Sequence, residues 1–224
     1  MDAPLLQIKD VKKYFPVKKV RGGEDIAVKA VDSIDLTINS GEIVGLVGES
    51  GCGKSTLGKS ILKLYDITEG QILFHGEDIT NYTEKQMHPL REKIQIIFQD
   101  PYASLNPKKK IVQSVMAPLN ATKKYTKEEK LQKVIAILNE VGLDEKYLEK
   151  YPHEMSGGQR QRVVIARALI NDPELVVCDE PVSALDVSVR SQVLNLLKDL
   201  QKSRNLTYIF ISHDLSVVEY LCDK

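Results

Sequence analysis

The stretch Gly48-Glu49-Ser50-Gly51-Cys52-Gly53-Lys54-Ser55-Thr56 follows the pattern G-x-x-x-x-G-K-[ST]. The run 42–47 before it is short, apolar and rich in β-branched residues, which is typical of a buried strand. The run 56–65 after it carries apolar residues at helical spacing. A strand, a glycine loop and a helix in this order predict a phosphate-binding loop, the P-loop. The alternative is a glycine-rich turn that matches the pattern by chance.

The chemistry of this loop follows from its residue types. Glycines let successive backbone N–H groups turn inward toward an anion, and the start of the following helix adds partial positive charge. Lys54 would bring a full charge to the β- and γ-phosphates, and the Ser55 hydroxyl is placed to bind Mg²⁺. The predicted nucleotide-binding residues of the loop are Gly48, Ser50, Gly51, Cys52, Gly53, Lys54, Ser55 and Thr56.

Composition places the chain among ordinary globular proteins. Of its 224 residues, 42% are hydrophobic and 28% are charged, which suggests one large domain or one domain with an insertion. Basic and acidic residues number 31 each, so no overall charge favours nucleic acid. The apolar runs are too short to span a bilayer, and the three cysteines lack metal-ligand spacing. Free thiols in a reducing cytosol are the simplest interpretation of those cysteines.

The order of elements predicts an α/β fold. Residues 5–15 and 27–38 alternate apolar and polar, as antiparallel strands do, with turn residues at 21–25 between them. Further strands are expected at 70–76, 94–98, 175–178 and 206–211, and helices at 187–200 and 214–221. Alternation of strands and helices predicts a mostly parallel core sheet, with ligands at the carboxyl ends of its strands.

Residues 107–171 depart from this pattern. Strand-like runs stop, and helical periodicity replaces them, most clearly at 127–141. We therefore predict a helical subdomain at about 107–171. It is inserted between a core of 1–106 and 172–224 that includes the N-terminal antiparallel strands.

Polar side chains follow three of the predicted core strands. Asp179 and Glu180 end the strand 175–178, which we expect to lie beside the P-loop strand. In a P-loop protein Asp179 would hold Mg²⁺, and Glu180 would orient and deprotonate the attacking water. Gln99 and His213 end two other strands, suited to reach toward the metal and the reacting water. Without the P-loop, the two acids would more simply begin a loop, a glutamine at a strand end is usually solvated, and a lone histidine is more often structural.

A second anion-binding device is predicted at Ser156-Gly157-Gly158-Gln159, before an apolar helix at 163–170. Ser156 is a good N-cap, and the glycines allow another molecule to approach the backbone amides. A glycine-rich helix cap without a ligand is the alternative.

Taken together, these motifs resemble the nucleotide-binding subunit of ABC transporters, in the same order and over essentially the whole chain. Residues 48–55 match the Walker A motif, Gln99 the Q-loop, and 155–159 the signature LSGGQ, with Met155 in place of leucine. Residues 175–179 match Walker B, Glu180 the catalytic glutamate, 183–186 the D-loop ending in Asp186, and His213 the switch histidine.

The resemblance carries further expectations. It implies ATP and Mg²⁺ as ligands, with Ser55, Gln99 and Asp179 near the metal and Glu180, His213 and Gln99 catalytic. An aromatic residue near the N-terminus stacks on adenine in the family; Phe15 is the candidate and Tyr14 the alternative. The signature of one subunit closes over the ATP of its partner, so two sites form at a head-to-tail homo- or heterodimer.

The Q-loop run 98–107 is similar to that of ATPases from dipeptide and oligopeptide importers, in particular the second of their two paired ATPase subunits. This implies two membrane permease subunits and, indirectly, a peptide-binding receptor as partners, a position at the cytoplasmic face of the membrane, and no nucleic acid. The helical subdomain is expected to dock the permease, with the segment after Gln99 at the contact. Nickel and glutathione importers use similar sequences, and ABC ATPases of DNA repair or translation are the remaining alternatives. Members of the group continue beyond the position of Lys224, so we expect a C-terminally truncated chain.

Overall fold

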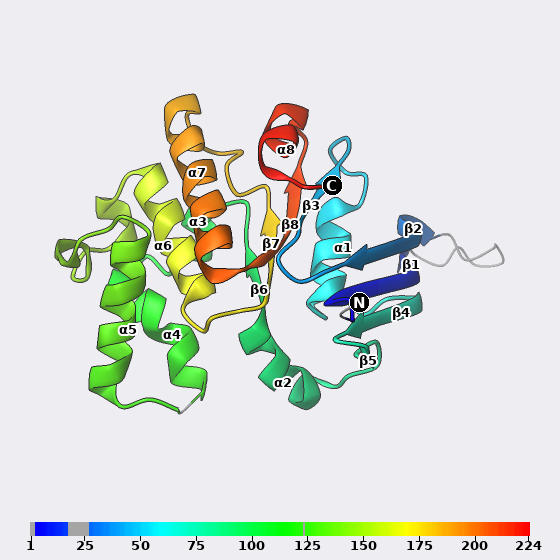
Figure 1. Cartoon of the computed structure of the whole chain (residues 1–224), viewed down its shortest axis with the longest axis horizontal. Coiled ribbons are helices and arrows are strands. Elements are labelled where there is room, and N and C mark those ends of the chain that lie inside the picture. The colour runs from blue at the N-terminus through cyan, green and yellow to red at the C-terminus, as the bar shows by residue number, and fades with distance from the viewer. Residues whose placement is uncertain (1–2, 18–26, 123) are drawn as a thin grey trace. The chain divides into compact units, whose positions relative to one another are not determined.

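The computed structural model describes residues 3–17, 27–122 and 124–224. The turn expected at 21–25 lies outside them. The described chain forms two compact units, one made of Met1–Arg91 with Ile209–Lys224 and the other of Glu92–Tyr208. Figure 1 shows the helices and strands of both.

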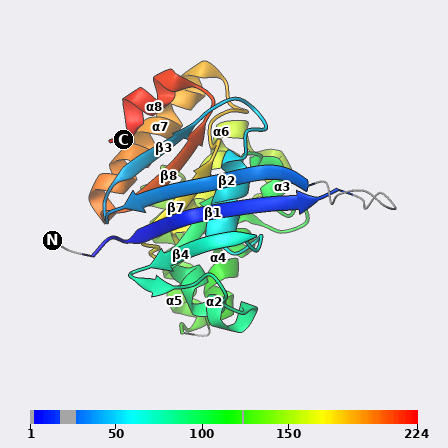
Figure 2. The ribbon, with the colours of Figure 1, turned by 90° about the vertical axis from the view of Figure 1, so that its right-hand side faces the viewer.

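The first unit contains an antiparallel sheet in the order β2-β1-β4-β5. β1 pairs antiparallel with β2, with Leu6 opposite Ile38, and also with β4, with Leu6 opposite Phe74. Figure 2 shows β2, β1 and β4 side by side. The hairpin expected before the P-loop is confirmed. The strand expected at 70–76 is also confirmed, and it pairs with β1 in the same sheet. The elements of this unit are β1 (Leu6–Pro16), β2 (Ala27–Ile38), β3 (Ile43–Val47), α1 (Lys54–Ile61), β4 (Glu69–Phe74), β5 (Glu77–Asp78) and α8 (Leu215–Leu221).

The second unit is mainly helical around two parallel strands. β6 and β7 pair in parallel, with Ile94 opposite Leu175, and every residue of β7 is buried. Helix α6 supplies much of the core through the buried run from Val163 to Ala166. The elements of this unit are β6 (Ile94–Ile97), α3 (Pro101–Ser104), α4 (Ile111–Thr122), α5 (Lys127–Glu140), the 3₁₀ turns Glu145–Tyr147 and Pro152–Glu154, α6 (Gly157–Leu169), β7 (Leu175–Asp179) and α7 (Val187–Arg204).

Two elements cross from one unit to the other: β8 (Thr207–Ser212) and α2 (Glu84–Lys93). The second sheet has the strand order β3-β8-β7-β6. The expectation that the strand 175–178 lies beside the P-loop strand is therefore wrong, because β8 comes between β3 and β7. Helical periodicity and strand alternation do not specify which strands are neighbours, so the sequence could not settle this point.

No helix in the described part of the chain is both long enough and apolar enough to cross a bilayer.

Candidate functional site: the nucleotide-binding motifs

The P-loop joins β3 to α1, as expected from the sequence. Gly51 and Gly53 have φ angles of 83° and 99°, a left-handed conformation that side chains disfavour. Gly53 also touches β2 so closely that a Cβ atom there would lie 1.8 Å from the carbonyl oxygen of Ala30. The loop therefore needs glycine at position 53 for two independent reasons.

Helix α1 begins with the features of an anion site. No side chain caps it at Gly53, and its first turn holds no acidic residue. The first N–H groups of a helix need partners from outside the helix, and they carry partial positive charge. This end of α1 therefore favours an anionic ligand.

The Lys54 ammonium lies over the loop. Its Nζ donates to the carbonyl oxygens of Gly48 and Glu49, both at 2.7 Å, and lies 3.6 Å from Cys52 Sγ. These contacts hold a positive charge at the loop. When a phosphate binds, its oxygens would replace the two carbonyl oxygens as acceptors for the Lys54 ammonium.

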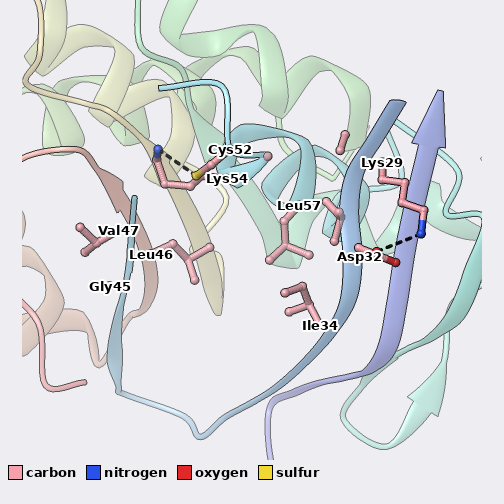
Figure 3. Close-up of a pocket in the computed structure, with 12 residues that line it drawn as sticks. Lys29, Asp32, Ile34, Gly45, Leu46, Val47, Cys52, Lys54 and Leu57 are labelled. Atoms are coloured by element: carbon pink, nitrogen blue, oxygen red, sulfur yellow. Dashed lines mark hydrogen bonds and ion pairs between the residues drawn. The ribbon is translucent and has the colours of Figure 1, made fainter. Parts of the chain in front are cut away.

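A pocket of about 510 Å³ extends from the loop to β2. Figure 3 shows Leu46, Leu57 and Ile34 gathered between the Cys52–Lys54 contact on one side and the Lys29–Asp32 contact on the other. An apolar surface beside a cationic loop suits a ligand with a flat, weakly polar base and a phosphate tail. The site is thus compatible with ATP.

Neither of the two aromatic candidates for adenine stacking is among the residues that line this pocket. The Phe15 ring packs edge-on against Tyr65, with centroids 5.5 Å apart. The Tyr14 hydroxyl donates to Asp32, which does line the pocket, and this bond lowers the pKa of the Asp32 carboxyl. The choice between Phe15 and Tyr14 stays a prediction.

In the second unit, the structure brings together the two polar residues that follow β6 and β7. Gln99 Nε2 donates to Glu180 Oε2 at 3.1 Å. Glu180 has a φ of 47°, which is uncommon for a residue with a side chain. The adjoining Asp179 is only 5% exposed. Carboxylate and amide oxygens are ligands suited to Mg²⁺, so the chemistry of Asp179 and of the exposed Gln99 fits the predicted metal.

The signature residues form the start of α6. Ser156 Oγ accepts a hydrogen bond from the Gln159 backbone N–H, and Gln159 Oε1 accepts one from the Ser156 N–H. This capping box places the start of the helix at Gly157, six residues before the expected 163–170 segment. A Cβ atom on Gly158 would lie 2.4 Å from Val189 Cγ1 on α7, so this glycine is required by packing.

The remaining predicted residues lie at exposed positions. Asp186 precedes α7 as its N-cap residue, without a side-chain capping bond. His213 follows β8 directly, in the other unit, and its side chain is exposed. Arg160 lies one residue beyond the signature and contacts the Tyr102 ring and the carbonyls of Pro152 and Met155. No sequence pattern indicates these contacts.

Comparison with known proteins agrees with these motifs. A family model described as ABC transporter matches residues 31–183. The chain belongs to the ABC transporter family. It is 51% identical over 222 residues to the "Oligopeptide transport ATP-binding protein AppF" of Bacillus subtilis (strain 168), a match covering 98% of this chain and 68% of that relative. It is 47% identical over 224 residues to the "Dipeptide transport ATP-binding protein DppF" of Escherichia coli (strain K12), covering 100% of this chain and 67% of that relative.

A solved ABC structure supports the same assignment. The "ATP-binding cassette MJ0796 bound to ADP and Pi", described as a dimer in a post-hydrolysis state, superposes with a TM-score of 0.84 at 30% identity, covering 96% of this chain and 90% of that one. The P-loop α/β fold with an antiparallel part and the membership in a family of ATPases are therefore confirmed. The roles of the individual site residues stay predictions.

Proposed function

We propose that the chain is the ATP-binding and ATP-hydrolysing subunit of an importer of di- or oligopeptides. The observation that carries this proposal is the P-loop, in which Gly53 closes on β2 and Lys54 Nζ sits over two loop carbonyls. The names of the peptide-transport relatives support the cargo.

ATP would bind with its phosphates on the P-loop and the start of α1. Lys54 exchanges its carbonyl partners for phosphate oxygens, and the uncapped amides of α1 supply further donors. Ser55, Asp179 and Gln99 would hold Mg²⁺, which neutralises charge on the phosphates. The adenine base would stack on Phe15 or Tyr14, neither of which lines the pocket beside the P-loop.

Hydrolysis would depend on Glu180. Its carboxylate, kept in place by the 3.1 Å bond from Gln99, accepts the proton of the attacking water. Gln99 and His213 assist by orienting that water. The second copy or paired subunit would bring Ser156 and Gly158 to the γ-phosphate, completing each site from two chains.

In this proposal the chain works at the cytoplasmic face of the membrane, with two permease subunits and a receptor that delivers the peptide.

The experiment that tests the proposed function has two readouts, ATP turnover and peptide uptake. ATP turnover of the full chain is measured for the parent, for Lys54→Ala and for Lys59→Ala. Lys59 is a lysine of the same helix whose ammonium lies 5.8 Å from the Tyr65 ring centroid, away from the loop contacts. Turnover should vanish only in Lys54→Ala.

Cargo is then measured as uptake of a labelled tripeptide by cells that carry each variant. Loss of peptide uptake with Lys54→Ala, and normal uptake with Lys59→Ala, is the expected result. Loss of nickel or glutathione uptake with peptide uptake intact would overturn the cargo while leaving the ATPase assignment in place.

A further inference from the structure

Two arginines on one face of α6 hold the short helix α3. Arg160 and Arg167 are seven residues apart, about two turns of helix, so they project from the same side. The Arg160 Cζ lies 4.8 Å from the centroid of the Tyr102 ring, and Arg167 donates to the carbonyl oxygen of Ser104. Helix α3 is therefore fixed near its start and at its end.

Arg160 also binds the segment just before the signature. Its Nη1 donates to the Met155 carbonyl at 2.7 Å and to the Pro152 carbonyl at 3.2 Å. A planar guanidinium can stack on a ring with its face and donate hydrogen bonds in its plane at the same time. One side chain thus joins α3 to the residue that directly precedes Ser156.

The start of α3, where Arg160 contacts Tyr102, leads to the predicted catalytic pair. The Asp100 side chain caps α3 by accepting from the Tyr102 N–H at 2.7 Å. Gln99 is the residue before Asp100, and its amide donates to Glu180. Since α3 has only four residues and Asp100 is bonded to the Tyr102 N–H, we expect a shift of Tyr102 to move Asp100 and Gln99 with it.

We propose that Arg160 is a positioning residue for ATP hydrolysis. Its contacts with Tyr102 and with the Met155 carbonyl fix the orientation of the turn at Ser156 relative to Gln99 and Glu180. The inference rests on the proposed function, because it assigns Arg160 a part in that same reaction. In this proposal Arg160 acts on the reaction only through the groups it holds.

The test compares purified full-length variants for ATP turnover, for binding of a fluorescent ATP analogue and for the midpoint of chemical unfolding. Arg162→Ala is the matched control, since Arg162 lies on the same helix but donates to the Val141 carbonyl after α5. Arg160→Ala should lower kcat by about tenfold or more, because small misplacements of reacting groups carry large rate penalties. Analogue binding should stay unchanged, and Arg162→Ala should keep the parent kcat.

Substitutions at Tyr102 and a double variant separate positioning from plain stability. Tyr102→Phe retains the ring and should behave as the parent, while Tyr102→Leu should lower kcat in the direction of Arg160→Ala. Arg160→Lys, which keeps a cation over the ring, should recover part of the loss. The double variant Arg160→Ala/Tyr102→Leu should be no worse than Arg160→Ala, since the two side chains act through one contact.

Equal losses of kcat in Arg160→Ala and Arg162→Ala, tracking their unfolding midpoints, would refute the inference. So would additive effects in the double variant. If Arg160→Ala fails to fold, Tyr102→Leu against Tyr102→Phe decides the question. A parent without ATP turnover would refute the proposed function and this inference together, whereas an active parent with unaffected Arg160→Ala and Tyr102→Leu would refute the inference alone.

Discussion

Replacing Gly53 by alanine tests how strictly the P-loop depends on its contact with β2. The added Cβ would meet the Ala30 carbonyl oxygen at 1.8 Å, and the partner is backbone, which cannot rotate away. To relieve this overlap, the loop and the strand must move apart by roughly 1 Å. A displacement of this size at reacting groups can lower the rate by on the order of a hundredfold. The left-handed φ of 99° adds about 1–2 kcal/mol of strain for a residue with a side chain.

Two other glycines provide matched controls. Gly51 and Gly76 have φ angles of 83° and 78°, and a Cβ on either would meet nothing within 4 Å. Alanine at these positions introduces backbone strain without a steric overlap. The loss of stability is partly offset by about 0.4–1 kcal/mol, because alanine makes the unfolded chain less flexible. Gly76 lies in the turn between β4 and β5, so Gly76→Ala should lower stability slightly and leave turnover intact.

The assay measures ATP turnover and urea unfolding of the three variants side by side. Gly53→Ala should lose turnover by about a hundredfold, Gly51→Ala should lose less, and Gly76→Ala none. Gly53→Ala with the turnover of Gly51→Ala would show that β2 yields to the new methyl group without moving the loop, and the argument from close approach would be refuted.

Three other perturbations test separate parts of the chain. Glu180→Gln keeps an oxygen to accept from Gln99 but cannot take a proton from water, so turnover should fall about a hundredfold or more with an unchanged unfolding midpoint; retained turnover would point to another base. Cross-linkers placed in residues 100–115 should capture a permease subunit in whole membranes, and capture only from sites elsewhere would contradict the docking prediction. Hydrogen bonds from Asn39 to the Glu42 carboxylate hold its pKa at about 2, below the ordinary 4.5. Glu42→Gln should therefore lower the free energy of unfolding at pH 7. The difference in this free energy between parent and variant should shrink as the pH falls from 4.5 to 2. A pH-independent difference in urea unfolding would exclude this carboxylate as its source.

Motifs tied to local backbone geometry could be predicted from the sequence. The P-loop, the capping residue Ser156 and the strand before Asp179 each follow from patterns within about ten residues. Helix α2 could not be found in this way, because it carries Pro89 and buries only Met87. Its weak apolar face gives little periodic signal.

The parts of the site that depend on distant partners were beyond sequence reasoning. Nothing in the sequence indicates that Gln99 bonds to Glu180, since 81 positions separate them. Arg160 in the sequence is one polar residue on an amphipathic helix, and only the fold shows a ring on one side of it and two carbonyls on the other. Alternation along β1 places Tyr14 and Phe15 on opposite faces but does not show which face meets a ligand.

The double role of Gln159 restricts how this chain can evolve. Its side-chain oxygen caps the Ser156 N–H, and its side-chain nitrogen donates to the Tyr147 hydroxyl at 3.0 Å. Glutamate serves as well at this position of a capping box, so helix formation alone would tolerate Gln159→Glu. The exchange would place a negative charge at the start of the helix where we propose that the partner's ATP phosphate binds. Under this proposal, substitution at position 159 is limited by charge and not by shape, and a lineage that accepted the carboxylate would keep the fold of α6 but weaken closure of the signature over the partner's ATP.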